Sequence, residues 1–253
     1  MNAGKVIYDF GSNNGDDIPY YLMKAGRVVA VEANSVLCAQ IRSRFHEAIR
    51  DGRLVVENCV LDVAPARDAV PFHIHRANHV LSQFPKPPEA QSSQFEGILL
   101  PSRNVVDLVR HYGEPFYVKC DLEQFDQAIL GALFAHGIRP PYISAESHGI
   151  EVFATLLALG GYRAFKLVDG ASVSTKYRDA GIRTEAGLVK YSFPHHSAGP
   201  FGEDVRGPWM TPDNFFRLLG WVGLGWKDIH ATSVEAADPD YAPQPRVQFS
   251  VDY

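Results

Sequence analysis

A glycine turn flanked by carboxylates lies within residues 6–22, VIYDFGSNNGDDIPYYL. The segment predicts a buried strand, then a tight turn, then the start of a helix. Gly11 and Gly15 allow positive φ and close approach of the backbone to a ligand. Because ligands of open parallel sheets bind beyond the carboxyl ends of the strands, the turn predicts a site for a nucleoside-like ligand. The nearby carboxylates are Asp9, Asp16 and Asp17.

Charge indicates which ligand suits this turn. Glu32 ends the next predicted strand, where a carboxylate can accept both ribose hydroxyls of either NAD or S-adenosylmethionine (SAM). The pyrophosphate of NAD binds at a helix N-terminus, but Asp16 and Asp17 occupy that place, and like charges there would be repulsive. The turn GSNNG also lacks the third glycine of GxGxxG. SAM carries a sulfonium and an ammonium and no phosphate, so the acidic turn favours SAM, although one aspartate could simply cap the helix.

Apolar strand-like runs alternate with helical ones along the chain. Near-continuous apolar runs are typical of strands covered on both faces. The predicted strands are residues 5–10, 27–33, 54–61, 115–122 and 142–146. The predicted helices are residues 17–24, 35–52, 125–137 and 150–161. This alternation predicts an α/β, Rossmann-like, doubly wound fold with a mostly parallel sheet and helices on both faces.

The 253 residues predict one domain with two irregular regions. An insertion around residues 70–104 is expected to carry a short hairpin and a mobile loop, because VPFHIH precedes a run rich in proline and serine. Residues 191–213 are dense in glycine, proline, histidine and tryptophan. We expect them to form an ordered loop that covers the substrate.

Composition bounds the partners and the compartment. The net charge of −5 gives no reason to expect nucleic-acid or anionic-membrane binding. No apolar run is long enough to span a bilayer, and the N-terminal residues do not resemble a secretory signal. The three cysteines form no CxxC pair, which favours buried thiols in a reducing compartment. We therefore predict a cytoplasmic protein; the sequence does not indicate an oligomeric state.

Several of these segments together resemble the FkbM-type methyltransferases, a family of class I SAM-dependent enzymes. DFGSNNGDDIPYYL and RVVAVEAN are similar to the first two motifs of that family, and VKCDLEQFD resembles its fourth-strand motif. YISAE resembles its fifth strand, and SAGPFGEDVRGPW and WKDIHA resemble segments of a subset. The resemblance implies a seven-stranded sheet with a reversed final hairpin. It also implies O-methylation of a hydroxyl on a small molecule or glycan, such as a sugar or natural product, with S-adenosylhomocysteine as the second product.

The resemblance also implies which residues bind the cofactor. The turn from Asp9 to Gly15, with Asp17, would hold the methionine part, and Glu32 would hold the ribose. Adenine would lie beside the residues that end the second and third strands, and Asp121 would face the amino acid end. The implied cofactor-binding residues are Asp9, Gly11, Ser12, Asn13, Asn14, Gly15, Asp17, Glu32, Ala33, Asn34, Asn58, Cys59, Val60 and Asp121. One departure is Gln124, where the family usually has glycine.

Methyl transfer needs an in-line arrangement of nucleophile, carbon and sulfur, and a hydroxyl nucleophile benefits from a base. Asp121 and Glu123 lie two apart on an extended segment and can point to one side of the sheet. Glu146 and His148 end the fifth strand. The predicted catalytic residues are Asp121, Glu123, His148 and His196.

Each of these residues has a structural alternative. The two acids could cap a helix, His148 could be a strand-end residue, and His195 and His196 could be a surface pair. Asp228 and His230 are later candidates for the base, or they belong to a structural strand. 

The sequence does not favour a metal. His73, His75 and His79 lack the spacing of a strong ligand pattern. Asp121, Glu123 and His148 could bind a divalent ion that orients a vicinal diol, which is a second arrangement left open. 

The leading hypothesis is therefore a SAM-dependent O-methyltransferase. The alternatives are a non-catalytic SAM-binding or scaffold protein of the same fold, and an NAD-dependent oxidoreductase.

Overall fold

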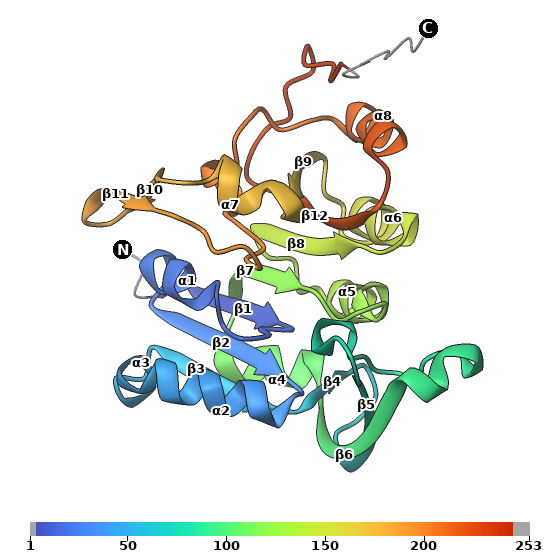
Figure 1. The fold of residues 1–253 in the computed structure, drawn as a ribbon. Coiled ribbons are helices and arrows are strands. Elements are labelled where there is room, and N and C mark those ends of the chain that lie inside the picture. The colour runs from blue at the N-terminus through green and yellow to red at the C-terminus, as the bar shows by residue number, and fades with distance from the viewer. Residues whose placement is uncertain (1–3, 245–253) are drawn as a thin grey trace, which may run out of the picture.

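A seven-stranded sheet forms the centre of the molecule (Figure 1). The computed structural model describes residues 4–244. The strand order is β3-β2-β1-β7-β8-β12-β9. The strands are β1 (Val6–Phe10), β2 (Arg27–Glu32), β3 (Leu54–Asn58), β7 (Pro115–Cys120), β8 (Tyr142–Ser147), β9 (Ala164–Asp169) and β12 (Gly225–Thr232).

The direction of the strands confirms the predicted fold class. Every neighbouring pair from β3 to β8 is parallel. Strand β12 is reversed, and it pairs antiparallel with β8 on one side and β9 on the other. The sheet is therefore mostly parallel and doubly wound, and its last strand in the chain is reversed. WKDIHA, residues 226–231, lies within β12.

Two helical layers cover the sheet because its strands are apolar on both faces (Figure 1). Apolar side chains of α4, α5, α6 and α8 pack on one face, and those of α1, α2 and α7 pack on the other. The helices are α1 (Ile18–Lys24), α2 (Ser35–Arg44), α3 (His46–Arg50), α4 (Val105–Tyr112), α5 (Asp126–Ala135), α6 (Ile150–Ala158), α7 (Val173–Lys176) and α8 (Pro212–Val222). The helix predicted over residues 35–52 is broken at Phe45, whose ψ of 28° leaves the helical range. Neither α4 nor α8 is among the predicted helices.

The insertion forms a small sheet of its own. The strand predicted over residues 54–61 divides at Cys59, and β4 (Val60–Asp62) leaves the main sheet. β4 joins β6 (Phe95–Asn104), which pairs antiparallel with β5 (Arg67–His75). Two 3-10 turns, η1 (His79–Leu81) and η2 (Glu89–Gln94), lie between β5 and β6. The hairpin is therefore longer than the short one predicted.

The segment of residues 191–213 packs on the face of the sheet that carries α1. Phe201 is buried and stacks on Tyr117, with ring centroids 3.9 Å apart. Trp209 is also buried, and it donates a hydrogen bond from Nε1 to Glu203. The segment follows the hairpin of β10 (Ala180–Thr184) and β11 (Gly187–Tyr191), and it contains the turn η4 (Gly202–Asp204). Ten of its 23 residues are buried, so much of the segment packs against the sheet, and its role in covering a substrate stays a prediction.

Within residues 4–244, no helix combines the length and apolar character needed to cross a membrane. The three cysteines are buried free thiols, as predicted.

Candidate cofactor and active site

A hollow of about 610 Å³ follows the carboxyl edge of the sheet. It extends from Glu32 at the end of β2 to Asp121 and Glu146 after β7 and β8. The segment of residues 78–84, between β5 and β6, supplies an outer wall. A second hollow of about 40 Å³ shares several of the same wall residues, among them Asn13, Asp121 and Glu146. Ligands of open α/β sheets bind at this edge.

The glycine turn is held against both neighbouring strands. Gly11 has φ of +82°, and a Cβ there would lie 1.9 Å from the backbone oxygen of Asp121, so only glycine fits. The amides of Gly11 and Ser12 donate to the carbonyl of Val31 at 3.0 and 3.1 Å. Asn13 is also in the left-handed region, with φ of 47°. These contacts place the turn in the wall of the hollow.

Glu32 joins the first turn to the second strand. One carboxylate oxygen, Oε2, accepts a hydrogen bond from the amide of Asn13 at 2.9 Å, and Oε1 accepts one from the amide of Asn34 at 2.7 Å. Burial raises the pKa of Glu32 to about 7, against the effect of these two hydrogen bonds. The carboxylate lines the hollow and keeps acceptor capacity for a ligand.

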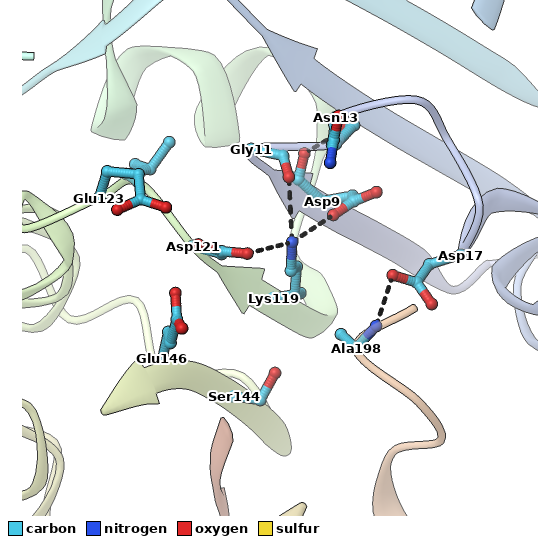
Figure 2. Close-up of polar contacts among 12 residues, drawn as sticks. Asp9, Gly11, Asn13, Asp17, Lys119, Asp121, Glu123, Ser144, Glu146 and Ala198 are labelled. Atoms are coloured by element: carbon cyan, nitrogen blue, oxygen red, sulfur yellow. Dashed lines mark hydrogen bonds and ion pairs between the residues drawn. The ribbon is translucent and has the colours of Figure 1, made fainter. Parts of the chain in front are cut away.

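Lys119 lies at the centre of the acidic groups and is buried at the end of β7 (Figure 2). Its Nζ donates to the carbonyl of Gly11 at 3.0 Å and to Oδ2 of Asp121 at 3.1 Å, and it lies 3.8 Å from Oδ1 of Asp9. Burial and the nearby Asp17 carboxylate raise the pKa of Asp9 to about 6, although Lys119 opposes the shift. Lys119 was not among the predicted site residues. A lysine within an apolar strand is a usable signal, because lysine is almost never fully buried without a partner.

Four side chains gather at the far end of the hollow, namely Asp121, Glu123, Glu146 and His148. One potential ligand atom from each lies within 4.8 Å of all the others. Nε2 of His148 lies 2.9 Å from Oε2 of Glu146 and 3.9 Å from Oε2 of Glu123. Figure 2 shows Glu123 and Glu146 on the side of Asp121 that faces away from Lys119.

The cluster perturbs the acidity of its members. Burial and the Asp121 carboxylate raise the pKa of Glu123 to about 8. Burial opposes the charged form of His148, but the carboxylates of Glu146, Asp126 and Glu123 together outweigh burial and raise the pKa of His148 to about 9. Burial also acts on Asp121, yet the Lys119 ammonium holds the pKa of Asp121 below its usual range. Groups perturbed in this way and facing a hollow are candidates for proton transfer.

The turn after β7 has left-handed backbone at two consecutive residues. Glu123 has φ of 46° and Gln124 has φ of 79°. Glycine readily adopts this left-handed conformation, and Gln124 stands where the FkbM-type motif usually has glycine. The backbone therefore keeps the conformation although the glycine is absent. Glu123 lines the hollow.

Most of the residues predicted to bind a cofactor line one of the two hollows. Those in the larger hollow are Gly11, Asn13, Glu32, Ala33, Cys59, Val60 and Asp121. Ser12, Asn14 and Asp17 line the smaller one. The carboxylate of Asp17 does not cap α1; it accepts hydrogen bonds from Ser197 Oγ and from the amide of Ala198.

Four other predicted residues support the wall from behind. Asn58 donates from Nδ2 to the carbonyls of Glu32 and Ala33 at 3.0 and 2.9 Å. The side chain of Asn34 caps α2 by accepting from the amide of Val36. Asp9 and Gly15 also line neither hollow. Their positions indicate that they order the turn, and a direct cofactor contact stays a prediction for them.

The four residues predicted to be catalytic, Asp121, Glu123, His148 and His196, all line the larger hollow. His196 lies beside Trp226, with ring centroids 6.3 Å apart. His195 and His230 line neither hollow.

The imidazole of His230 is buried, which lowers its pKa to about 3.

Among residues 4–244, the acidic cluster with His148 is the one group whose ligand atoms come close enough for a metal. His73, His75 and His79 form no such group.

No family model matches the chain, and neither does any curated protein. Among solved structures, the chain is similar to a methyltransferase FkbM from Methylobacillus flagellatus KT, with 12% identity and a TM-score of 0.43 over 66% of this chain and 40% of that one. It is also similar to a precorrin-6y C5,15-methyltransferase from Geobacter metallireducens GS-15, with 10% identity and a TM-score of 0.40 over 91% and 81%.

A SAM-dependent O-methyltransferase from Thermotoga maritima has 9% identity and a TM-score of 0.39 over 93% of this chain and 62% of that one. These likenesses are remote. Membership of the FkbM-type family therefore stays a prediction.

Proposed function

We propose that this chain is a SAM-dependent methyltransferase that methylates a hydroxyl group on a small molecule or glycan. The observation that carries the proposal is the charge of the large hollow. Its wall has carboxylates at both ends, Glu32 at one and Asp121, Glu123 and Glu146 at the other. Among the described residues, no lysine or arginine lines it. 

A ligand with a pyrophosphate would find no lysine or arginine among the described residues of this wall, and the imidazole of His148 is already paired with Glu146 at 2.9 Å. The N-terminus of α1 offers no partner either, because Asp16 and Asp17 precede it. Asp16 already pairs with Arg44 at 2.8 Å, and the carboxylate of Asp17 is bonded to residues 197–198. SAM fits this chemistry, since its sulfonium and ammonium gain from nearby carboxylates. These features disfavour NAD.

The adenosine part of SAM would lie at the Glu32 end. The carboxylate of Glu32 can accept the two ribose hydroxyls. Ala33, Leu37 and Val60 provide apolar wall around the place of the adenine ring. The methionine part would then extend past the glycine turn toward Asp121. This orientation leaves the acceptor at the end of the hollow that holds Glu123, His148 and His196.

In the proposed reaction, the acceptor oxygen attacks the methyl carbon of SAM as the carbon–sulfur bond breaks. The hydroxyl proton passes to a base, and the products are a methyl ether and S-adenosylhomocysteine. Glu123 and His148 are the candidate bases, because both face the hollow and both have raised pKa values. The positive charge of bound SAM would lower these pKa values and free a base near neutral pH.

Calorimetric titration tests the cofactor part of the proposal. We expect the intact protein to bind SAM and S-adenosylhomocysteine but not NAD. Glu32→Ala should weaken SAM binding by about 1–3 kcal/mol, or roughly 5- to 150-fold, because it leaves buried polar groups unpaired. Glu57→Gln is the matched control, since Glu57 is a bonded carboxylate on the adjacent strand that does not line the hollow. An intact protein that binds neither SAM nor its demethylated product would refute the proposal.

Methyl release to a panel of hydroxylated acceptors tests the catalytic part. Turnover should be lost in Glu123→Ala or His148→Ala while SAM still binds. SAM binding without turnover of any acceptor would instead support a non-catalytic binding protein.

A further inference from the structure

We propose that Asp121, Glu123, Glu146 and His148 bind a divalent metal ion, with Mn²⁺ as the ion that suits them best. The four ligand atoms come from the ends of β7 and β8 and from the turns that follow these strands. They lie within 4.8 Å of one another. Opposite ligands of an ion with bonds of about 2.1–2.2 Å are separated by about 4.3 Å, so the site needs to close by only a few tenths of an ångström.

The cluster has more negative charge than its protein partners balance. Among the described residues, Lys119 is the only lysine or arginine that pairs with the cluster, and its Nζ lies 3.1 Å from Oδ2 of Asp121. Lys119 also pairs with Asp9, which lies outside the cluster. Neither Glu123 nor Glu146 has a lysine or arginine partner in the part of the chain that the structure describes. One carboxylate oxygen of Asp121 and one of Glu146 lie within 4.8 Å of each other. Two partly buried carboxylates this close repel each other unless a positive charge lies between them.

A second observation points to a cation in the same place. Asp228 on β12 lies opposite Glu146 in the antiparallel pair, so the two side chains leave the same face of the sheet. Asp228 is 5% exposed and lines the smaller hollow together with Asp121 and Glu146. Within residues 4–244 its carboxylate has no hydrogen bond and no ion pair. A buried carboxylate without a partner is costly, so Asp228 is suited to hold a metal-bound water.

The ligand set indicates the kind of metal. Three carboxylates and one imidazole form a mixed oxygen and nitrogen set without thiolate. Mg²⁺ prefers oxygen ligands alone, and structural Zn²⁺ prefers four nitrogen or sulfur ligands, whereas Mn²⁺ accepts oxygen together with imidazole. Four protein ligands leave two positions of an octahedron open.

The open positions would suit oxygen atoms of a methyl acceptor. This step rests on the proposed function, and it names the class of the acceptor. An acceptor with two adjacent oxygens, such as a vicinal diol, could fill both. With the ion bound, Glu123 and His148 would act as ligands and not as bases. The ion would lower the pKa of the bound hydroxyl, and the hydroxyl proton would pass to water. His196 and Trp226 line the same part of the hollow and could contact the rest of the acceptor.

Electron paramagnetic resonance of Mn²⁺ titrated into the full chain, without SAM, tests the site directly. We expect one bound Mn²⁺ per chain. Glu146→Gln and His148→Ala should each weaken binding by more than about tenfold, and Asp228→Asn by about tenfold as a partner of a bound water. Glu123→Gln is a further ligand variant in a turn, where a failure to fold is less of a concern. Glu57→Gln is the control and should bind as the intact protein does.

Two results would overturn the inference: no bound Mn²⁺ in the intact protein, or binding that the four site variants leave unchanged. Equal loss in Glu57→Gln would overturn it as well, because binding would then not be specific to the cluster. The proposed function has a separate readout. A chain that binds SAM and not Mn²⁺ refutes only the metal site, and a chain that binds Mn²⁺ and not SAM refutes only the proposed function.

Discussion

Replacement of Lys119 by methionine tests how the acidic site is held together. Methionine keeps much of the length of the side chain but removes its charge. The ammonium contacts the Gly11 carbonyl at 3.0 Å and Asp121 at 3.1 Å, and it lies 3.8 Å from Asp9. After the change, two carboxylates and one carbonyl lose their shared partner. All of these groups lie at the carboxyl edge of β1 and β7.

The expected loss follows from those contacts. Removing one partner of a buried ion pair costs about 3–5 kcal/mol, because the other charge stays buried and unpaired. The unpaired Gly11 carbonyl adds about 1 kcal/mol. A loss of about 4–6 kcal/mol is a large part of the stability of a typical domain, about 5–15 kcal/mol. The double variant Lys119→Met with Asp9→Asn should recover part of the lost stability, because it removes one of the buried carboxylates that the first change leaves without a partner.

The loss should also depend on pH. Removing the ammonium raises the folded-state pKa of Asp9 further above its unfolded value, and it removes the charge that holds the pKa of Asp121 below its usual range. Stability associated with a raised pKa is present at low pH and is lost as the pH rises through the folded-state value. The difference between Lys119→Met and the intact protein should therefore be larger at pH 8 than at pH 5.

Urea denaturation followed by tryptophan fluorescence, at both pH values, measures these differences. Lys166→Met is the matched control. Lys166 is buried and donates to the carbonyl of Val205 at 2.8 Å, but among the described residues it has no ion-pair partner. Lys166→Met should lower the free energy of unfolding by less than Lys119→Met does, and by nearly the same amount at pH 5 and pH 8. A cost below about 1 kcal/mol for Lys119→Met, or a cost that does not grow with pH, would refute the reasoning.

Two further predictions concern the same edge of the sheet. Gln124→Gly should stabilise the protein by about 0.5–1 kcal/mol in urea denaturation, because relief of left-handed strain exceeds the added freedom of the unfolded chain. Gln124→Ala should give no such gain, and an equal gain in both variants would contradict this explanation. The free energy of unfolding of the cofactor-free chain should fall by at least about 2 kcal/mol from pH 5 to pH 8.5, since Asp9, Glu32 and Glu123 have pKa values raised to about 6, 7 and 8. Calorimetry across that range measures how the free energy of unfolding changes with pH. In Glu32→Gln this change should be smaller near pH 7. A free energy of unfolding that rises from pH 5 to pH 8.5 would contradict the prediction.

The regular parts of the fold were predictable because their signal is local. Five apolar runs rich in β-branched residues correspond to strands of the main sheet. The helix over residues 35–52 was predicted as one, but Phe45 breaks it where its ring packs against the core. The strand over residues 54–61 was predicted as one, but its last residues pair with β6, some forty residues later in the chain. No local pattern contains that pairing.

The sequence by itself determined the sheet, the acidic glycine turn and the carboxylate at Glu32. These features depend on residue type and short spacing, which set backbone conformation and charge within a few residues. Only the tertiary structure decided that Lys119 neutralises Asp9 and Asp121, that Asp17 bonds the segment at residues 197–198, and that Asp228 lies opposite Glu146. Those contacts join residues far apart in the chain, and their strength depends on burial, which no single segment carries.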